Sequence, residues 1–150
     1  MQISSRFTIA VHVLIAIETF KKDYKVTSEF LASSANVNPT VIRRLLQQLK
    51  KAGIVTVKRG RGGADIDRPL REITLLDVYR AVEPVENGQL FHFHEKPNER
   101  CPVGRNIHRI MDGRLEEIQS AMEEKMRSVT IADVMEDAEK LLEDDYCCNA

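Results

Sequence analysis

Apolar side chains recur at three- and four-residue intervals along much of this chain, and such spacing predicts helices. The segment from Phe7 to Phe20 is apolar around most of its circumference, which is typical of a helix buried in a core. A shorter helix is predicted over Ser28–Ala35, because the hydroxyl of Thr27 can cap its first turn. After a polar turn at positions 36–38, Pro39 suits the first position of another helix. The apolar stripe of that helix comprises Val41, Ile42, Leu45, Leu46 and Leu49.

Two short runs after this helix predict a β-hairpin. Ile54–Val57 follows Gly53, which ends the helix, and Ala64–Asp67 is the return strand. The loop between them, Arg59–Gly63, holds arginines and glycines. Helix, turn, basic helix and basic hairpin in this order are typical of a winged helix-turn-helix, whose second helix suits the major groove of DNA.

The second half of the chain predicts three more helices. Ile73–Val82 has the spacing of a short helix that Pro84 stops, and Pro102 begins a long one. The apolar stripe of the long helix comprises Val103, Ile107, Ile110, Met111, Leu115, Ile118, Met122 and Met126. A final helix is predicted over Ile131–Leu142. The expected fold is mainly α: a winged helix-turn-helix DNA-binding domain (1–84), a sensory or linker loop (85–101), dimerisation helices (102–142) and a flexible tail (143–150).

Basic residues gather in the second helix of the motif and in the hairpin. Those between positions 41 and 71 are Arg43, Arg44, Lys50, Lys51, Lys58, Arg59, Arg61, Arg68 and Arg71, against the acids Asp65 and Asp67. From position 112 to 145 acidic residues outnumber basic ones. The net charge of −1 is therefore the sum of a basic segment in the first half of the chain and an acidic segment near its C-terminus. Arginines on a helix surface are more often solvated than bound to DNA, but these lie on the two surfaces that a duplex would touch.

Composition restricts the class of protein. A chain of 150 residues, 43% of them hydrophobic, can bury one core, and no segment approaches the ~18 apolar residues of a membrane span. We therefore expect no membrane partner. Three cysteines, with Cys147 and Cys148 adjacent, indicate no disulfide framework and favour a reducing cytoplasm. The chain has none of the common hydrolase, metalloprotease or nucleotide-binding motifs, so we expect no enzymatic activity.

The apolar stripe of the long helix needs a cover. The helix could fold back on its own domain, or it could pair with a second copy of the chain. Most soluble oligomers are two-fold dimers with self-complementary surfaces, which favours a homodimer. A dimer would hold two recognition helices about one duplex turn, ~34 Å, apart and would bind a palindromic operator.

Four segments carry a resemblance to a known family: Ser4–His12, Arg59–Gly63, Ile73–Glu83 and Cys101–Gly104. Together they resemble the Rrf-type bacterial transcription regulators, which include IscR, NsrR and CymR. Within that family the chain is most similar to the YwnA-type members, which lack the three cysteines that bind a cluster. The resemblance implies a homodimeric transcription regulator, usually a repressor, that senses iron–sulfur status, nitric oxide, redox state or cysteine metabolism.

The resemblance also implies which residues contact DNA. In the recognition helix, the residues expected to reach base edges are Thr40, Arg43, Arg44 and Gln47. In the wing, Arg59 and Arg61 are expected to reach phosphates or the minor groove. Arg6, Thr27 and Ser28 complete the expected set. Some winged helices serve only as protein-interaction modules, which is the alternative from another class, but those would lack this arginine-rich face.

The loop before the long helix is the expected sensory segment. Cluster-binding relatives carry three cysteines there, whereas this chain has only Cys101, so we expect no iron–sulfur cluster and no other cofactor. His92 and His94 could join Cys101 in a zinc site, which leaves a metal- or iron–sulfur-dependent sensor as an alternative. Cys101 also precedes a helix whose dipole favours a thiolate. It is therefore a candidate redox sensor, or else a cysteine that has lost the role it had in an ancestor.

Overall fold

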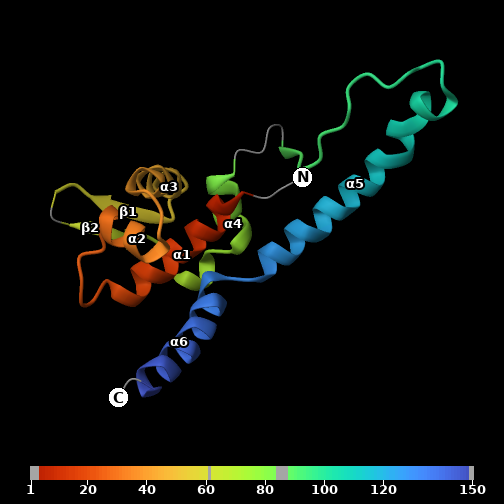
Figure 1. Ribbon diagram of the computed structural model, residues 1–150. Helices are drawn as coiled ribbons and strands as arrows, with labels where there is room; N and C mark the ends of the chain where they lie inside the picture. The colour runs from red at the N-terminus through yellow and green to blue at the C-terminus, as the bar shows by residue number, and fades with distance from the viewer. Residues whose placement is uncertain (1–3, 61, 84–87, 149–150) are drawn as a thin grey trace.

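The computed structural model describes residues 4–60, 62–83 and 88–148, without the side chains of 146–148, and shows a mainly helical protein (Figure 1). Its elements are α1 (Ser5–Phe20), α2 (Ser28–Ala35), α3 (Pro39–Lys51), β1 (Val55–Lys58), β2 (Gly63–Ile66), the 3-10 turn η1 (Leu70–Glu72), α4 (Leu75–Val82), α5 (Pro102–Ser128) and α6 (Ile131–Cys148). The elements from α1 to α4 form a winged-helix domain, from which α5 extends away. The expected fold class is confirmed.

Helix α1 lies at the centre of the winged-helix domain, as its apolar circumference predicts. Ala10, Val13, Leu14 and Ile17 are fully buried, and α1 packs against α2, α4, α6 and β2. Burial of each large aliphatic side chain contributes about 1.5–3 kcal/mol to the free energy of unfolding. This helix therefore supports both the DNA-binding motif and the start of α6.

The helix-turn-helix forms where the capping residues predict it. Thr27 accepts a hydrogen bond from the backbone N–H of Phe30 (3.2 Å) and so caps α2. Asn36 ends that helix in the left-handed conformation (φ 52°), and the side chain of Asn38 caps α3. Val41 was expected in the apolar stripe of α3 but is 38% exposed. At 100° per residue, it falls outside the arc of buried residues, which are Ile42, Leu45, Leu46 and Leu49.

The wing is an antiparallel hairpin in which Val55 pairs with Ile66 and Lys58 with Gly63. Its first strand begins one residue later than predicted, because the N–H of Ile54 bonds to Leu49 at the end of α3 (3.0 Å). The return strand begins one residue earlier, at Gly63, which has φ +69°. A β-carbon at Gly63 would lie 2.9 Å from the carbonyl oxygen of Val26. The base of the wing thus packs directly on the segment before α2.

Helix α4 begins at Leu75 rather than at Ile73. Thr74 and Asp77 form a reciprocal capping box that sets its start. Ile73 is instead extended and fully buried, and its carbonyl accepts from the N–H of Ile131 (2.8 Å). The sequence pattern missed η1, a single turn just before this point. Residues 73–75 therefore hold the joint between α5 and α6 against the winged-helix domain.

Helices α5 and α6 lead in different directions from this joint (Figure 1). Helix α5 begins at Pro102 as predicted, whereas α6 continues to Cys148, past the predicted end at Leu142 and into the segment expected to be a flexible tail. No glycine or proline follows Leu142 before Cys148 to interrupt the backbone hydrogen bonds. Ile131 and Met135 are buried in the core of the winged-helix domain. Within the described part of the chain, no helix combines the length and apolar character needed to cross a membrane.

Candidate nucleic-acid interface

A hollow of about 420 Å³ lies between α2, α3 and the wing. Its polar and charged lining consists of Thr27, Ser28, Glu29, Arg43, Gln47, Lys50, Lys58 and Arg59. Five of the expected DNA-contacting residues are among them: Thr27, Ser28, Arg43, Gln47 and Arg59. Segments that are separate in the sequence thus contribute to one concave, predominantly basic surface.

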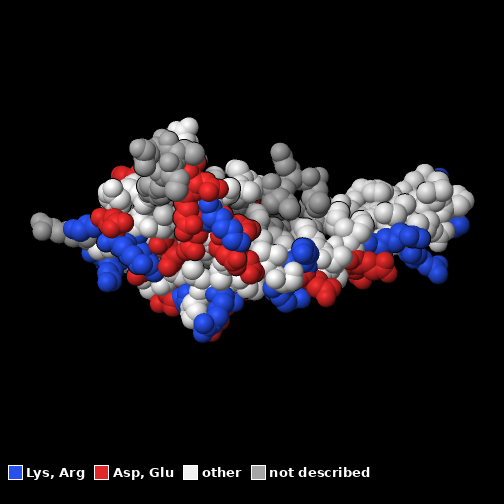
Figure 2. Space-filling view, turned by 90° about the horizontal axis from the view of Figure 1, so that it is seen from below, with Lys and Arg blue, Asp and Glu red and all other residues white. Residues whose placement is uncertain are grey.

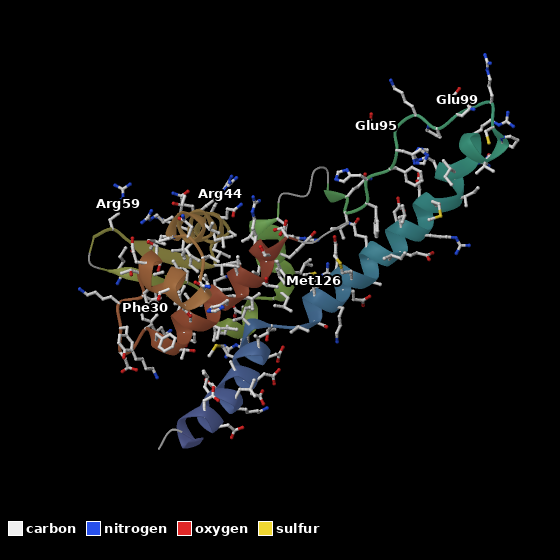
Figure 3. The ribbon with its side chains drawn as sticks, viewed as in Figure 1. Phe30, Arg44, Arg59, Glu95, Glu99 and Met126 are labelled. Carbon is white, nitrogen blue, oxygen red and sulfur yellow. The ribbon has the colours of Figure 1, made fainter. Side chains whose placement is uncertain are left out.

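The exposed face of α3 borders this hollow. Thr40, Arg43, Arg44 and Gln47 are all exposed there. Arg44 on α3 and Arg59 on the wing point away from the domain on the same side (Figure 3). Acidic side chains gather elsewhere, in a band over α6 on the face seen in Figure 2. The segregation of charge along the sequence therefore becomes a segregation in space.

One acidic residue interrupts the basic surface. Glu29, in the first turn of α2, accepts a hydrogen bond from the guanidinium of Arg43 at 2.7 Å through Oε1. Its Oε2 accepts from the hydroxyl of Ser28 at 3.1 Å. Arg43 is the main reason that the pKa of the Glu29 carboxyl is lowered, followed by a backbone hydrogen bond and Ser28. This carboxylate is ionised at neutral pH.

The expected set of DNA-contacting residues left out Glu29, Lys50 and Lys58, which also line this surface. The two lysines were visible in the cluster of basic residues. Glu29 had a weaker signal, an acid in the first turn of the helix before the recognition helix. Its partner lies fourteen positions away in the sequence, so only the packing of α2 on α3 reveals the pair.

Among the described residues, the predicted DNA contacts Arg6, Thr40 and Arg44 do not line the hollow. Arg6 lies in the first turn of α1, half-buried, next to Phe7, whose ring packs edge-on against Tyr79 of α4 (centroids 5.9 Å apart). Thr40 is exposed at the start of α3. Arg61 lies outside the described residues.

Comparisons with known proteins agree with this geometry. The model of the Rrf2 family, described as an iron-dependent transcriptional regulator, matches residues 3–137. This chain belongs to the Rrf2 family. It is a helix-turn-helix transcription regulator that binds DNA, and the predicted resemblance is confirmed.

Relatives cover nearly the whole of this Rrf2 chain. YwnA of Bacillus subtilis, named as a candidate HTH-type transcriptional regulator, is 44% identical over 133 residues, or 89% of this chain and 96% of its own. A crystal structure of a candidate DNA-binding protein shares 38% identity with a TM-score of 0.69, covering 87% of this chain and 99% of that one. IscR of T. potens shares the fold at 22% identity, with a TM-score of 0.69 and coverage of 94% and 90%.

The loop that leads to α5 lies along that helix. The side chain of Gln119 donates to the carbonyl of Gly88 (2.6 Å) and accepts from the N–H of Leu90 (3.1 Å). Further along, the ring of Phe93 packs on that of His108, with centroids 4.2 Å apart. Two side chains of α5 therefore contact this loop, Gln119 near its first described residues and His108 near its middle.

Cys101, half-exposed, is the residue immediately before α5. Hydrogen bonds from the backbone N–H groups of Gly104 and then Val103 lower the pKa of its thiol. Gly104 also permits a close approach of the loop, because a β-carbon there would lie 2.3 Å from the carbonyl oxygen of Asn98. The local geometry stabilises a thiolate at this position.

The described residues do not fit the iron named in the family description. In the part of the chain that the structure describes, no group of three or more histidine, cysteine or acidic side chains is arranged to hold a metal ion. The zinc site suggested for His92, His94 and Cys101 is therefore not formed by these residues: both histidines are exposed on an irregular segment that does not bring them together with the thiol. Among the described side chains, Cys101 is the one cysteine, and a single thiolate supplies too few ligands for a cluster.

Proposed function

We propose that this Rrf2 protein acts as a cytoplasmic homodimer that binds a palindromic operator and represses transcription. The observation that carries the proposal is the shared basic surface of α3 and the wing, which presents Arg43, Arg44, Gln47 and Arg59 together. A guanidinium on a helix in the major groove can bond to the O6 and N7 atoms of guanine. Cations on a wing suit the neighbouring phosphates. Repression is the activity that the family resemblance favours.

The exposed apolar side of α5 supports a homodimer. Val103 is 63% exposed, Ile110 52% and Ile118 56%, and α5 has no buried residue. The helix reaches its own winged-helix domain chiefly through α4, where Arg80 pairs with Glu123 (3.1 Å). A second copy of α5 about a two-fold axis would cover this surface with the same residues. It would also set two α3 helices on successive turns of one duplex face.

Cys101 is the candidate sensor in this proposal. Its thiol lies at the N-terminus of α5, in a loop that runs between the winged-helix domain and the dimer helix. A thiolate at a partly exposed site is the form that oxidants attack. Oxidation at the start of α5 would change how that helix meets its partner and therefore the spacing of the two α3 helices. No cofactor is needed for this response.

The test is a selection of bound duplexes from a random-sequence library by the full-length protein, followed by binding measurements over a range of salt concentrations. We expect an enriched inverted repeat, and affinity that falls steeply as salt is added, because phosphate contacts release counterions. Recovery of no preferred sequence, or binding insensitive to salt, contradicts the proposed function. It would favour the alternative, a winged helix that binds other proteins.

A further inference from the structure

Glu29 places a negative charge within a surface that faces a polyanion. Both of its carboxylate oxygens have partners, Oε1 with Arg43 on α3 and Oε2 with Ser28 on α2. The pair remains open to solvent, with the Arg43 side chain 55% exposed and that of Glu29 63% exposed. It lines the same hollow as Lys58 and Arg59. An acid at this position costs affinity for phosphate, so its presence needs a compensating role.

The pair constrains Arg43 in a way that Arg44 is not constrained. An arginine side chain carries five N–H donors, and the contact with Glu29 uses its terminal Nη2. The other donors stay available on the open side of the guanidinium. Arg44 has no ion-pair partner among the described residues and projects freely (Figure 3). The two neighbouring arginines thus differ in both orientation and net local charge.

We propose that Glu29 is a specificity-determining residue that orients the guanidinium of Arg43 toward base edges and withholds its charge from phosphates. The inference rests on the proposed reading of DNA by α3. A held guanidinium loses less conformational entropy when it meets the O6 and N7 atoms of guanine. A guanidinium whose charge is neutralised gains little from a phosphate, and phosphates are present in every DNA sequence. Both effects raise the ratio of operator binding to non-specific binding.

Salt dependence separates this role from a simple structural one. Each phosphate contact made by a free cation adds about 0.9 to the slope of log affinity against log salt concentration. The Glu29–Arg43 pair is neutral as a unit and adds almost nothing. Replacing Glu29 with glutamine frees the charge of Arg43 and makes one more phosphate contact available. The prediction is stronger non-specific binding with a steeper salt slope.

The experiment compares the full-length parent with Glu29→Gln on two duplexes: one selected by the parent from a random library, and a scrambled duplex of the same composition. In Glu29→Gln we expect affinity for the scrambled duplex to rise about two- to fivefold, in line with the modest strength of exposed ion pairs. We also expect its salt slope to steepen by about 0.9 and the selected-to-scrambled ratio to fall. The matched control is Glu136→Gln, which removes the acid of another exposed ion pair, with Lys140 on α6.

The same substitution in an Arg43→Gln background tests whether Glu29 acts through Arg43. In that background, the ratio of affinities for the selected and the scrambled duplex should no longer change when Glu29 is replaced. The inference is contradicted if Glu29→Gln has the same selected-to-scrambled affinity ratio and the same salt slope as the parent. It is also contradicted if replacing Glu29 lowers that affinity ratio by the same factor in the Arg43→Gln background as in the parent. A parent that selects no sequence contradicts the proposed function as well, whereas a selective parent with an unaltered Glu29→Gln contradicts only this inference.

Discussion

Thr74 and Thr130 lie opposite each other in an isolated antiparallel bridge, and each caps a helix that begins beside it. Thr74 forms its capping box with Asp77 of α4, and Thr130 forms one with Asp133 of α6. The backbone bonds of Leu75 to Val129 (2.9 Å) and of Ile131 to Ile73 (2.8 Å) flank the bridge. The end of α5 is thereby fastened to the DNA-binding domain.

The first prediction concerns this fastening. Thr130→Ala removes the hydroxyl that accepts the N–H of Asp133 (3.2 Å), and loss of such a cap typically costs about 1 kcal/mol. We expect the free energy of unfolding in urea to fall by about that amount, with little change in the dependence on urea concentration. Ser120→Ala, at an exposed position on α5, is the control and should unfold like the parent. Equal stability of Thr130→Ala and the control would show that the cap contributes nothing.

The second prediction concerns how the stability of the fold depends on pH. The backbone N–H of Thr130 and then its hydroxyl lower the pKa of Asp133 below its ordinary value of 3.8. Because the folded pKa lies below the unfolded one, this stabilisation is fully present above pH 3.8 and is lost as the pH falls through the folded pKa. Asp133→Asn should therefore lose less stability than the parent between pH 5 and pH 2, roughly the range in which carboxyls titrate. Parallel stability curves for the two proteins would contradict the assignment.

The third prediction separates the two ways in which the basic surface meets DNA. Arg44→Ala should cost about 1–3 kcal/mol on the selected operator and relax preference at one base pair, because a base-reading contact is lost. Arg59→Ala should instead weaken binding to all duplexes alike and reduce the salt slope by about one phosphate contact. Titrations on matched and mismatched duplexes at several salt concentrations measure both. If both variants bind every duplex as the parent does, this surface is not the one that binds DNA.

The fourth prediction is that α5 holds the dimer. Leu115→Asp places a charge in the apolar stripe, whose buried side chains would each contribute about 1.5–3 kcal/mol to association. We expect a monomer by light scattering, together with loss of operator binding. Ser120→Asp introduces the same charge on the opposite side of the helix and should leave the dimer intact. A parent protein that is monomeric at micromolar concentration would refute the dimer.

The fifth prediction concerns Cys101. Mild peroxide or diamide should change the affinity of the parent for its operator, whereas Cys101→Ser should not respond. The lowered pKa of the thiol predicts a faster reaction than that of an ordinary exposed cysteine near neutral pH. Cys147 and Cys148 are controls, and replacing both with serine should preserve the response. If Cys101→Ser responds like the parent, or if neither protein responds, Cys101 is not the sensor.

Local signals predicted the helix-turn-helix well, because its boundaries depend on residues that act within a few positions. Thr27, Asn36 and Pro39 cap, end and begin helices through their own backbone preferences, so α2 has its predicted bounds and α3 its predicted start. The start of α4 was missed because Ile73 fits a helical pattern, yet it pairs with the backbone of Ile131 far along the chain. Such pairing has no local signature.

The candidate DNA-binding surface was predictable in its charge but not in its internal contacts. The arginines of α3 and the wing stand out by number and position. The restraint of Arg43 by Glu29 depends on how α2 crosses α3, and the continuation of α6 beyond Leu142 depends on backbone hydrogen bonding that apolar spacing does not report. Which of these residues touch DNA stays a prediction.

The contact between Gly63 and Val26 fixes the foot of the wing on the segment before α2. A side chain at Gly63 has no space beside the Val26 backbone, and Ala64 donates to the carbonyl of Val26 at 2.8 Å. The tip is limited as well, because Gly60 has φ +80°, a conformation that side chains rarely adopt, and a β-carbon at Gly62 would lie 2.2 Å from the β-carbon of Lys58. Glycines thus set the course of the hairpin at both its foot and its tip, so the wing can change its contacts with DNA through its other side chains but not by replacing Gly60, Gly62 or Gly63.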